Sequence, residues 1–289
     1  MDKLIIQGGN RLNGRIPISG AKNSALKLMA ASLLTAEPVE LRNMPNLADS
    51  RFMSQLLSTL GVEVYWPQKA SVCQLNAADI TSTIAPYDQV RKMRATFNVL
   101  GPLLARVGHA TVSLPGGCAI GARPVNFHLD AFQKMGADIV IEQGYVKAAA
   151  LRGLQGADIE LPFPSVGATE HTMLAATLAK GTTRIINAAR EPEIVDIANM
   201  LKSMGAKIDG AGTEVITIDG VDALHGVSHS VMPDRIEAAT YAIAAAITGG
   251  KVELIGARPA TMEAVSAALG LANVSLRPTD REIENSNVT

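Results

Sequence analysis

The sequence predicts an α/β protein assembled from repeated units, and three observations lead to this prediction. First, a leucine or methionine that ends a helical stretch is followed by a glycine and a short strand at Gly61, Gly136 and Gly205, about 70 residues apart. A glycine just past a helix supplies the left-handed turn that ends it. Second, helical and strand patterns alternate along the chain. Third, 47% of the residues are hydrophobic but only 3% are aromatic, which suits helices packed closely on strands and argues against an all-β sandwich.

Each repeat is expected to contain a helix of small residues, a strand, a second helix and a further strand or hairpin. The first helix and first strand of the three repeats are predicted at 24–34 and 39–42, at 95–106 and 110–114, and at 172–179 and 183–187. A fourth unit begins at Arg235, with a helix at 237–247, a strand at 251–255 and a second helix at 261–269. Because one repeat cannot bury its own faces, we expect the repeats to pack around a shared core.

The charge balance and the cysteine content exclude several classes of protein. With 26 Lys and Arg against 27 Asp and Glu, the formal net charge is −1, so no general attraction to nucleic acid or to a membrane surface is expected. Two cysteines are too few for a disulfide framework in 289 residues. No apolar run is long enough to span a bilayer, and no signal-peptide pattern follows Met1. We therefore expect a cytoplasmic protein.

A glycine-rich loop at 114–124 is the first candidate for chemistry. A strand-like run ends at Pro115, two glycines follow, and Cys118 lies on the loop ahead of Arg123. A nearby guanidinium favours the thiolate, which is the reactive form of cysteine. The alternative is a small buried cysteine in a turn, since cysteine is among the most buried residue types. The second cysteine, Cys73, lies in a strand pattern that should shelter it, so we expect Cys118 to be the more reactive thiol.

Several ordered motifs run from the start of the chain to about residue 263. They are Ser-Gly-Ala-Lys-Asn at 19–23, Lys-Met-Arg-Ala at 92–95, Pro-Gly-Gly-Cys at 115–118, Gly-Ala-Arg-Pro-Val at 121–125, Ser-Val-Gly-Ala-Thr at 165–169, Arg-Glu-Pro-Glu-Ile-Val-Asp at 190–196 and Pro-Asp-Arg-Ile-Glu at 233–237. In this order the motifs resemble the UDP-N-acetylglucosamine 1-carboxyvinyltransferase family of enolpyruvyl transferases. The set is far more specific than any single glycine loop.

The resemblance implies a fold of two inside-out α/β barrel domains, each built from three similar units around a pseudo-threefold axis. Residues 22–232 would form one complete three-repeat domain, and residues 1–21 and 233–289 part of a second. The implied reaction moves an enolpyruvyl group from phosphoenolpyruvate to the 3-hydroxyl of UDP-N-acetylglucosamine, in peptidoglycan synthesis. This reaction would link the chain to cell-wall biogenesis, cell shape, the cell cycle and cell division. No cofactor, metal or nucleic acid is expected, and self-association through the incomplete second domain is a further expectation.

The resemblance also assigns roles to individual residues. Cys118 would be catalytic, as an acid during addition that can also bond covalently to phosphoenolpyruvate. The cations Lys22, Arg94 and Arg123 would hold the anionic substrates at the reacting distance, and Asn23 would face the sugar.

The remaining assignments concern the nucleotide. Pro124 and Val125 would line the uracil pocket. Ser165, Val166 and Gly167 would meet the nucleotide phosphates, for which a hydroxyl and open backbone amides are suitable donors. His128 belongs to the same motif as Val125, but taken by itself it is interpreted as a satisfied structural histidine.

Four residues depart from the family pattern. Ala48 and Phe163 each stand where the family usually has a lysine, and Asn126 and Phe127 replace an expected Asp-Leu. Two missing cations near an anionic nucleotide would weaken its attraction by up to a few kcal/mol if the contacts are desolvated.

The family's aspartate base and further arginines come from a part of the second domain that has no counterpart here, so we expect this chain alone to be impaired or inactive. One hypothesis is a carboxyvinyltransferase, or one completed by another chain. The other is a catalytically dead relative that binds a UDP-sugar or a partner protein. A shikimate-pathway enolpyruvyl transferase is a weaker candidate, because the Pro-Gly-Gly-Cys loop is not associated with it. A Rossmann dehydrogenase is weaker still, because no G-x-G-x-x-G is present.

Overall fold

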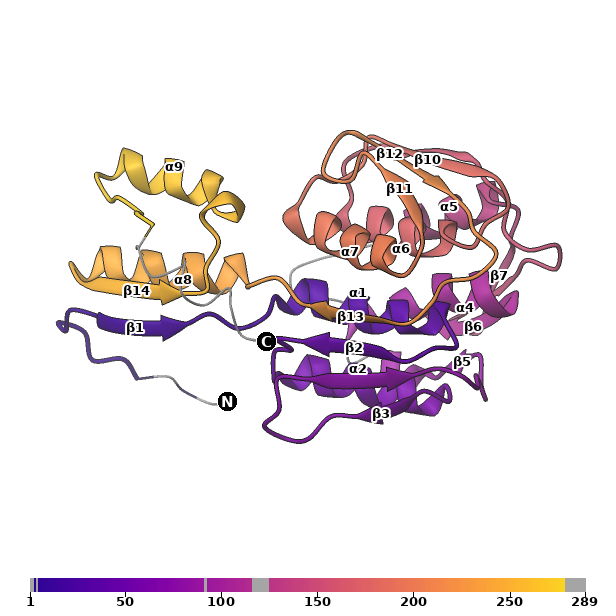
Figure 1. Ribbon diagram of the computed structural model, residues 1–289, viewed down its shortest axis with the longest axis horizontal. Helices are drawn as coiled ribbons and strands as arrows, with labels where there is room; N and C mark the ends of the chain where they lie inside the picture. Colours follow the sequence, from indigo (N-terminus) through magenta and orange to yellow (C-terminus); the bar gives the residue numbers. More distant parts are fainter. Residues whose placement is uncertain (1–2, 4, 91–92, 116–124, 279–289) are drawn as a thin grey trace. The chain divides into compact units, whose positions relative to one another are not determined.

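The structure, a computed structural model, describes residues 3, 5–90, 93–115 and 125–278. Its internal contacts divide the chain into two units (Figure 1). The larger unit is Lys22–Met232, and the smaller one combines Met1–Ala21 with Pro233–Thr289. None of the helices in these described ranges is both long and apolar enough to cross a membrane.

The larger unit alternates helices with short strands. Its helices are α1 (Lys22–Ala31), η1 (Ser32–Leu34), α2 (Ala48–Thr59), α3 (Tyr87–Val90), η2 (Arg94–Val99), α4 (Leu100–Val107), α5 (Asn126–Lys134), α6 (Val166–Ala176) and α7 (Pro192–Ser203), where η marks a 3₁₀ helix. Its strands are β2 (Val39–Arg42), β3 (Glu63–Tyr65), β4 (Cys73–Asn76), β5 (Ile84–Ala85), β6 (His109–Ser113), β7 (Asp138–Glu142), β8 (Tyr145–Ala149), β9 (Asp158–Glu160), β10 (Thr182–Ile186), β11 (Lys207–Asp209), β12 (Val215–Asp219) and β13 (Val227–Ser230).

The strands of this unit form three sheets with one shared topology. The strand orders are β13-β2-β4-β3, β5-β6-β8-β7 and β9-β10-β12-β11. In each sheet the first pair is parallel and the next two pairs are antiparallel. The parallel strand always comes from the end of the preceding repeat. For β13 this means pairing with β2, which joins the last strand of the unit to the first and closes the ring of repeats.

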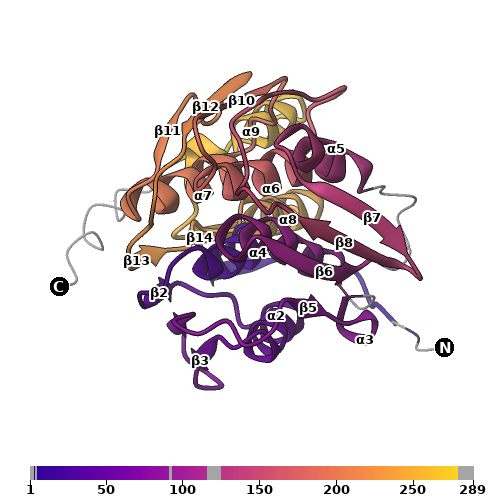
Figure 2. The ribbon, with the colours of Figure 1, turned by 90° about the vertical axis from the view of Figure 1, so that its right-hand side faces the viewer.

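The helices lie inside and the sheets lie outside, so the predicted inside-out α/β fold class is confirmed (Figures 1 and 2). Helices α1 and α6 are buried on nearly all sides. A helix in such a position is apolar around its whole circumference, or carries small residues and paired polar groups. The alanines of α1 and α6 supply the small residues.

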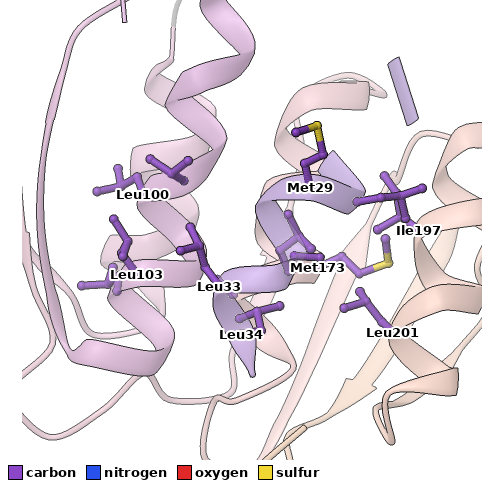
Figure 3. Close-up of a cluster of buried hydrophobic side chains, with 14 of the residues drawn as sticks. Met29, Leu33, Leu34, Leu100, Leu103, Met173, Ile197 and Leu201 are labelled. Atoms are coloured by element: carbon purple, nitrogen blue, oxygen red, sulfur yellow. The ribbon is translucent and has the colours of Figure 1, made fainter. Parts of the chain in front are cut away.

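The large side chains of the interior meet where α1, η1, α4, α6 and α7 come together. Figure 3 shows this cluster, whose labelled members are Met29, Leu33, Leu34, Leu100, Leu103, Met173, Ile197 and Leu201. Each of these residues is at most 2% exposed. Truncating any one of them would leave a cavity, which typically costs about 2–5 kcal/mol.

Two local expectations can be compared with the structure directly. Gly61, Gly136 and Gly205 have φ of 105°, 86° and 101° and follow the ends of α2, α5 and α7, so the predicted glycine stops are confirmed. The single helix expected at 95–106 is instead a 3₁₀ helix, η2, followed by α4. Pro102 explains the difference, because it has no N–H to donate to the carbonyl four residues earlier and is tolerated only in the first turn of an α-helix.

A buried ion pair connects α1 to α6. Nζ of Lys27 lies 3.0 Å from Oε2 of Glu170, whose side chain is fully buried. Oε1 of Glu170 accepts no hydrogen bond from the described residues. Burial raises the pKa of Glu170, and Lys27 opposes that effect. Removing one partner of such a pair costs more than removing both, because it leaves a buried charge unpaired.

The smaller unit consists of β1 (Asn13–Pro17), α8 (Arg235–Ile247), β14 (Lys251–Ile255), η3 (Pro259–Thr261) and α9 (Glu263–Leu271). β1 pairs in parallel with β14, and a small core forms around Ile18, Ala238 and Met262. The carboxylate of Asp234 caps α8 by accepting from the amides of Ile236 and Glu237 at 2.8 and 3.0 Å. The strand predicted at 251–255 is confirmed as β14.

We predict that Lys27→Met lowers the free energy of unfolding by about 3–5 kcal/mol at pH 8, because the charge of Glu170 is left buried without a partner. The folded-state pKa of Glu170 is raised, so stability is lost as pH rises through that pKa and is retained below the unfolded value. The loss should therefore shrink at pH 5.5. Urea denaturation at the two pH values measures it.

The double variant Lys27→Met/Glu170→Leu is the control, because it removes both charges and should be more stable than Lys27→Met at pH 8. An equal loss in the single and the double variant would contradict the assigned role of the ion pair.

Candidate functional site

The first turns of helices α5 and α6 lie next to each other. The ring of His128, in the first turn of α5, faces Gly167 so closely that a Cβ at Gly167 would lie 3.3 and 3.4 Å from its Cε1 and Nε2 atoms. Phe127 and Phe163 also meet edge to face, with ring centroids 5.0 Å apart. Two helix N-termini, each with the positive end of its dipole, therefore adjoin one surface, which is an arrangement that favours anions.

The α6 turn has donors that are available. Oγ of Ser165 caps α6 by accepting from the amide of Ala168 at 3.3 Å, which leaves the hydroxyl hydrogen of Ser165 able to donate elsewhere. The amides of Val166 and Gly167 have no acceptor among the described residues, as is usual for the first turn of a helix. The turn thus offers a hydroxyl and two amides, all donors, for one anionic group.

His128 adds a further donor to this surface. It is 6% exposed, its Nδ1 lies 2.9 Å from Nδ1 of His171, and no described residue bonds its Nε2. The pKa of His128 is lowered to about 3, mainly by burial and further by the charges of Arg94 and Lys27. The ring is therefore neutral at physiological pH. The interpretation of His128 as a satisfied structural histidine is confirmed at Nδ1, and at Nε2 it stays a prediction.

Arg94 begins the 3₁₀ helix η2 and is half-buried. Its charge lowers the pKa of His128, which means that its guanidinium acts on the same ring that faces Gly167. Of the residues assigned from the sequence, Gly167 thus lies against the ring of His128, and the charge of Arg94 acts on that ring. Val125 is the N-cap residue of α5.

Lys22 and Asn23 occupy the first turn of α1. Nζ of Lys22 lies 3.0 Å from Oδ2 of Asp49, and both side chains are more than 40% exposed. Asn23 is exposed. α1 is linked to the α5–α6 surface through Lys27, which pairs with Glu170 and acts on His128.

The carboxylate of Asp196, on α7, fixes the start of α1. It accepts hydrogen bonds from Oγ of Ser24 and, at 3.3 Å, from the amide of Met232. Both of these bonds go to Oδ2, and Oδ1 lies 3.0 Å from Nε2 of His229. Asp196 therefore holds together the beginning and the end of the larger unit, directly beside Lys22 and Asn23. Sequence reasoning placed Asp196 in a family motif but gave it no role.

Cys118, Arg123 and Pro124 lie outside the described residues, and their assignments stay predictions. The four departures can be placed. Ala48 begins α2, Asn126 begins α5, and Phe127 and Phe163 contact each other. The two aromatic departures are thus coupled in space, which their separation in sequence did not indicate.

Comparison with known proteins identifies the family of this chain. Residues 6–288 match the family described as EPSP synthase (3-phosphoshikimate 1-carboxyvinyltransferase). The chain belongs to this family. It is 67% identical over 276 residues to the UDP-N-acetylglucosamine 1-carboxyvinyltransferase of Hyphomonas neptunium, a match that covers 96% of the chain and 65% of the relative. The protein of the same name from Caulobacter vibrioides is 59% identical over 281 residues, covering 96% and 66%. The chain therefore spans about two thirds of the length of these relatives.

Solved structures agree on the fold. The enolpyruvyl transferase NikO of Streptomyces tendae aligns with a TM-score of 0.73 and 26% identity, over 82% of this chain and 56% of NikO. EPSP synthase from Acinetobacter baumannii aligns with a TM-score of 0.70 over 92% of this chain and 61% of its own, and at 21% identity it supports the fold alone. Within the described ranges no group of three or more His, Cys, Asp or Glu side chains could hold a metal ion.

The two thiols should differ sharply in reactivity. Cys73 is fully buried in β4, and burial raises its pKa to about 12, which confirms the sheltered position predicted for it. We expect brief alkylation of the native chain at pH 8, followed by peptide mapping, to label Cys118 and leave Cys73 unmodified.

The control pair is Cys118→Ser, which should abolish labelling, and Cys73→Ser, which should preserve it. Preferential labelling of Cys73 would contradict the prediction.

Proposed function

We propose that this chain carries out, or contributes half of the site for, transfer of an enolpyruvyl group from phosphoenolpyruvate to the 3-hydroxyl of UDP-N-acetylglucosamine. The relatives named for that activity are 67% and 59% identical to it. The activity would give the chain a role in peptidoglycan synthesis and hence in cell shape, the cell cycle and cell division in the cytoplasm.

The observation that carries the proposal is the pair of helix N-termini at α5 and α6. We assign the diphosphate of the nucleotide to this surface, where the amides of Val166 and Gly167, the hydroxyl of Ser165 and the Nε2–H of His128 all donate. Arg94 supplies a fixed positive charge beside these neutral donors. Hydrogen bonds to a charged group are worth about 1.5–3 kcal/mol each, so the cluster suits a phosphate far better than a neutral ligand.

The remaining roles follow the family assignments. Lys22 and Arg123 would hold phosphoenolpyruvate, Asn23 would face the sugar, and Pro124 and Val125 would line the uracil pocket. Cys118 would donate a proton to the enolpyruvyl group as the sugar oxygen adds, before phosphate leaves. Asp196 supports the roles of Lys22 and Asn23, because it anchors Ser24 and so holds the first turn of α1 in place.

Binding of UDP-N-acetylglucosamine to the 289-residue chain, followed by calorimetry, tests the assignment. Arg94→Ala should raise Kd by roughly 10- to 100-fold, corresponding to a lost charge-assisted contact of about 1.5–3 kcal/mol. Added salt should weaken wild-type binding more than that of the variant, because exposed charge interactions are screened.

The matched control is Arg184→Ala. Arg184 lies on β10, half-exposed and 3.4 Å from Asp158, so its removal changes the net charge equally without touching the α5–α6 surface. The same Kd for both variants would refute the assignment. Phosphate release with both substrates present then separates a transferase from a protein that only binds the nucleotide.

A further inference from the structure

His128 and His171 form a buried pair that joins α5 to α6. Their Nδ1 atoms are 2.9 Å apart, and their rings meet edge to face with centroids 5.1 Å apart. His171 is fully buried. On its far side, Nε2 of His171 lies 2.7 Å from the backbone nitrogen of Gly101, at the start of α4. The pair is thus one segment of a hydrogen-bond chain from α4 through α6 to α5.

The donor and acceptor of each hydrogen bond in this series follow from the amide of Gly101. The amide of Gly101 can only donate, so Nε2 of His171 must accept and carries no hydrogen. A neutral imidazole has one hydrogen, which in His171 is then on Nδ1. That hydrogen is donated to Nδ1 of His128, and His128 in turn carries its own hydrogen on Nε2. Each step is dictated by the preceding one, so a single backbone amide sets the tautomer of both rings.

We propose that His171 is a positioning residue, which transmits the donor character of the Gly101 amide to His128 and fixes its Nε2–H as a donor at the first turn of α6. The free hydrogen then lies beside Gly167. The role of the His128 Nε2–H as a hydrogen-bond donor to phosphate rests on the function proposed above, whereas the tautomers of the two rings do not.

The surroundings of His171 are shaped for this role. A Cβ at Gly101 would lie 2.6 Å from Cδ2 and 2.9 Å from Nε2 of His171, so only glycine lets the amide approach the ring. The rings of Phe97 and Phe132 each form a T-shaped pair with the same imidazole, at centroid distances of 5.8 and 4.8 Å. The ring has no room to turn over, and its two nitrogens keep their separate partners.

The charges around the pair oppose protonation. Lys27, on α1, and Arg94, on η2, face His128 and disfavour a second positive charge. Glu170 is adjacent to His171 in sequence but is already paired with Lys27. Burial lowers the pKa of His171 well below its usual value. His128 should therefore act as a neutral donor of constant orientation between pH 5 and pH 8, rather than as a titrating cation.

Imidazole ¹⁵N NMR of the ligand-free, full-length chain tests the assignment directly. We expect a protonated Nε2 and an unprotonated Nδ1 for His128, the reverse for His171, and no titration of either ring from pH 5 to pH 8. His128→Gln identifies its signals, and His109→Gln, at an exposed position on β6, is the control that should leave them unchanged. A hydrogen on Nδ1 of His128, or a charged ring at pH 7, would overturn the proposal.

Two substitutions separate positioning from packing. In His171→Asn the side-chain amide reaches roughly the Nδ1 position and can still donate to His128, so the Nε2–H form should persist. In His171→Gln the amide reaches roughly the Nε2 position, so it can satisfy Gly101 but not His128, and the ring of His128 should become a mixture of tautomers. The same tautomer population in both variants would refute the transmitting role of His171, and the wild-type measurement stands if either variant does not fold.

The ligand half of the proposal is tested with UDP added to the same sample. A shift of the Nε2 signal of His128, with Kd raised at least tenfold in His171→Gln but less in His171→Asn, is the expected result. Binding of UDP without any change at Nε2 would overturn the donor role of His128 while leaving the tautomers and the enolpyruvyl transferase proposal intact.

Discussion

The burial of α6 is the constraint on which the rest of the larger unit depends. An inside-out fold places this helix among other helices, with the sheets outside, so every residue of it after the first turn, from Ala168 to Ala176, is buried. Its buried polar groups then depend on internal partners, since an unpaired buried group costs about 1–3 kcal/mol or more. Among the described residues only Oε1 of Glu170 and Oγ1 of Thr172 on this helix have no hydrogen-bond partner besides the ion-paired Oε2 of Glu170. Glu170 is paired with Lys27, His171 with Gly101 and His128, and Thr169 with the amide of Ala189 at 3.0 Å. These contacts link α6 to α1, α4, α5 and the segment before α7.

The same constraint produces the candidate site. Because α5 and α6 are held together by the histidine pair, their first turns adjoin one surface, where the amides of Val166 and Gly167 have no acceptor among the described residues. The approach is close at Gly167, because a side chain at that position would press on the ring of His128 and push it by a few tenths of an ångström. The contact that packs the two helices thus also shapes the surface to which we assign the anion.

The aromatic departures modify this surface without removing its donors. Phe163 is half-exposed and meets Phe127 edge to face, so the rim of the site is more apolar than one bearing a lysine there. The backbone donors of α6 and the guanidinium of Arg94 do not depend on that rim. Among the described residues, the helix N-termini and Arg94 are therefore the features of the proposed anion site that the two aromatic departures leave unchanged.

The sequence by itself determined the local features of this protein. The glycine stops, the strand at 251–255 and the shelter of Cys73 follow from short-range patterns, because turn chemistry and hydrophobic periodicity act over a few residues. The motif order pointed to the family and to the residues of the α6 turn. Tertiary structure alone decided that β13 closes the ring on β2, that Lys27 pairs with Glu170, and that His171 orients His128. These contacts join residues far apart in the chain, and their energies depend on burial, which no local pattern records.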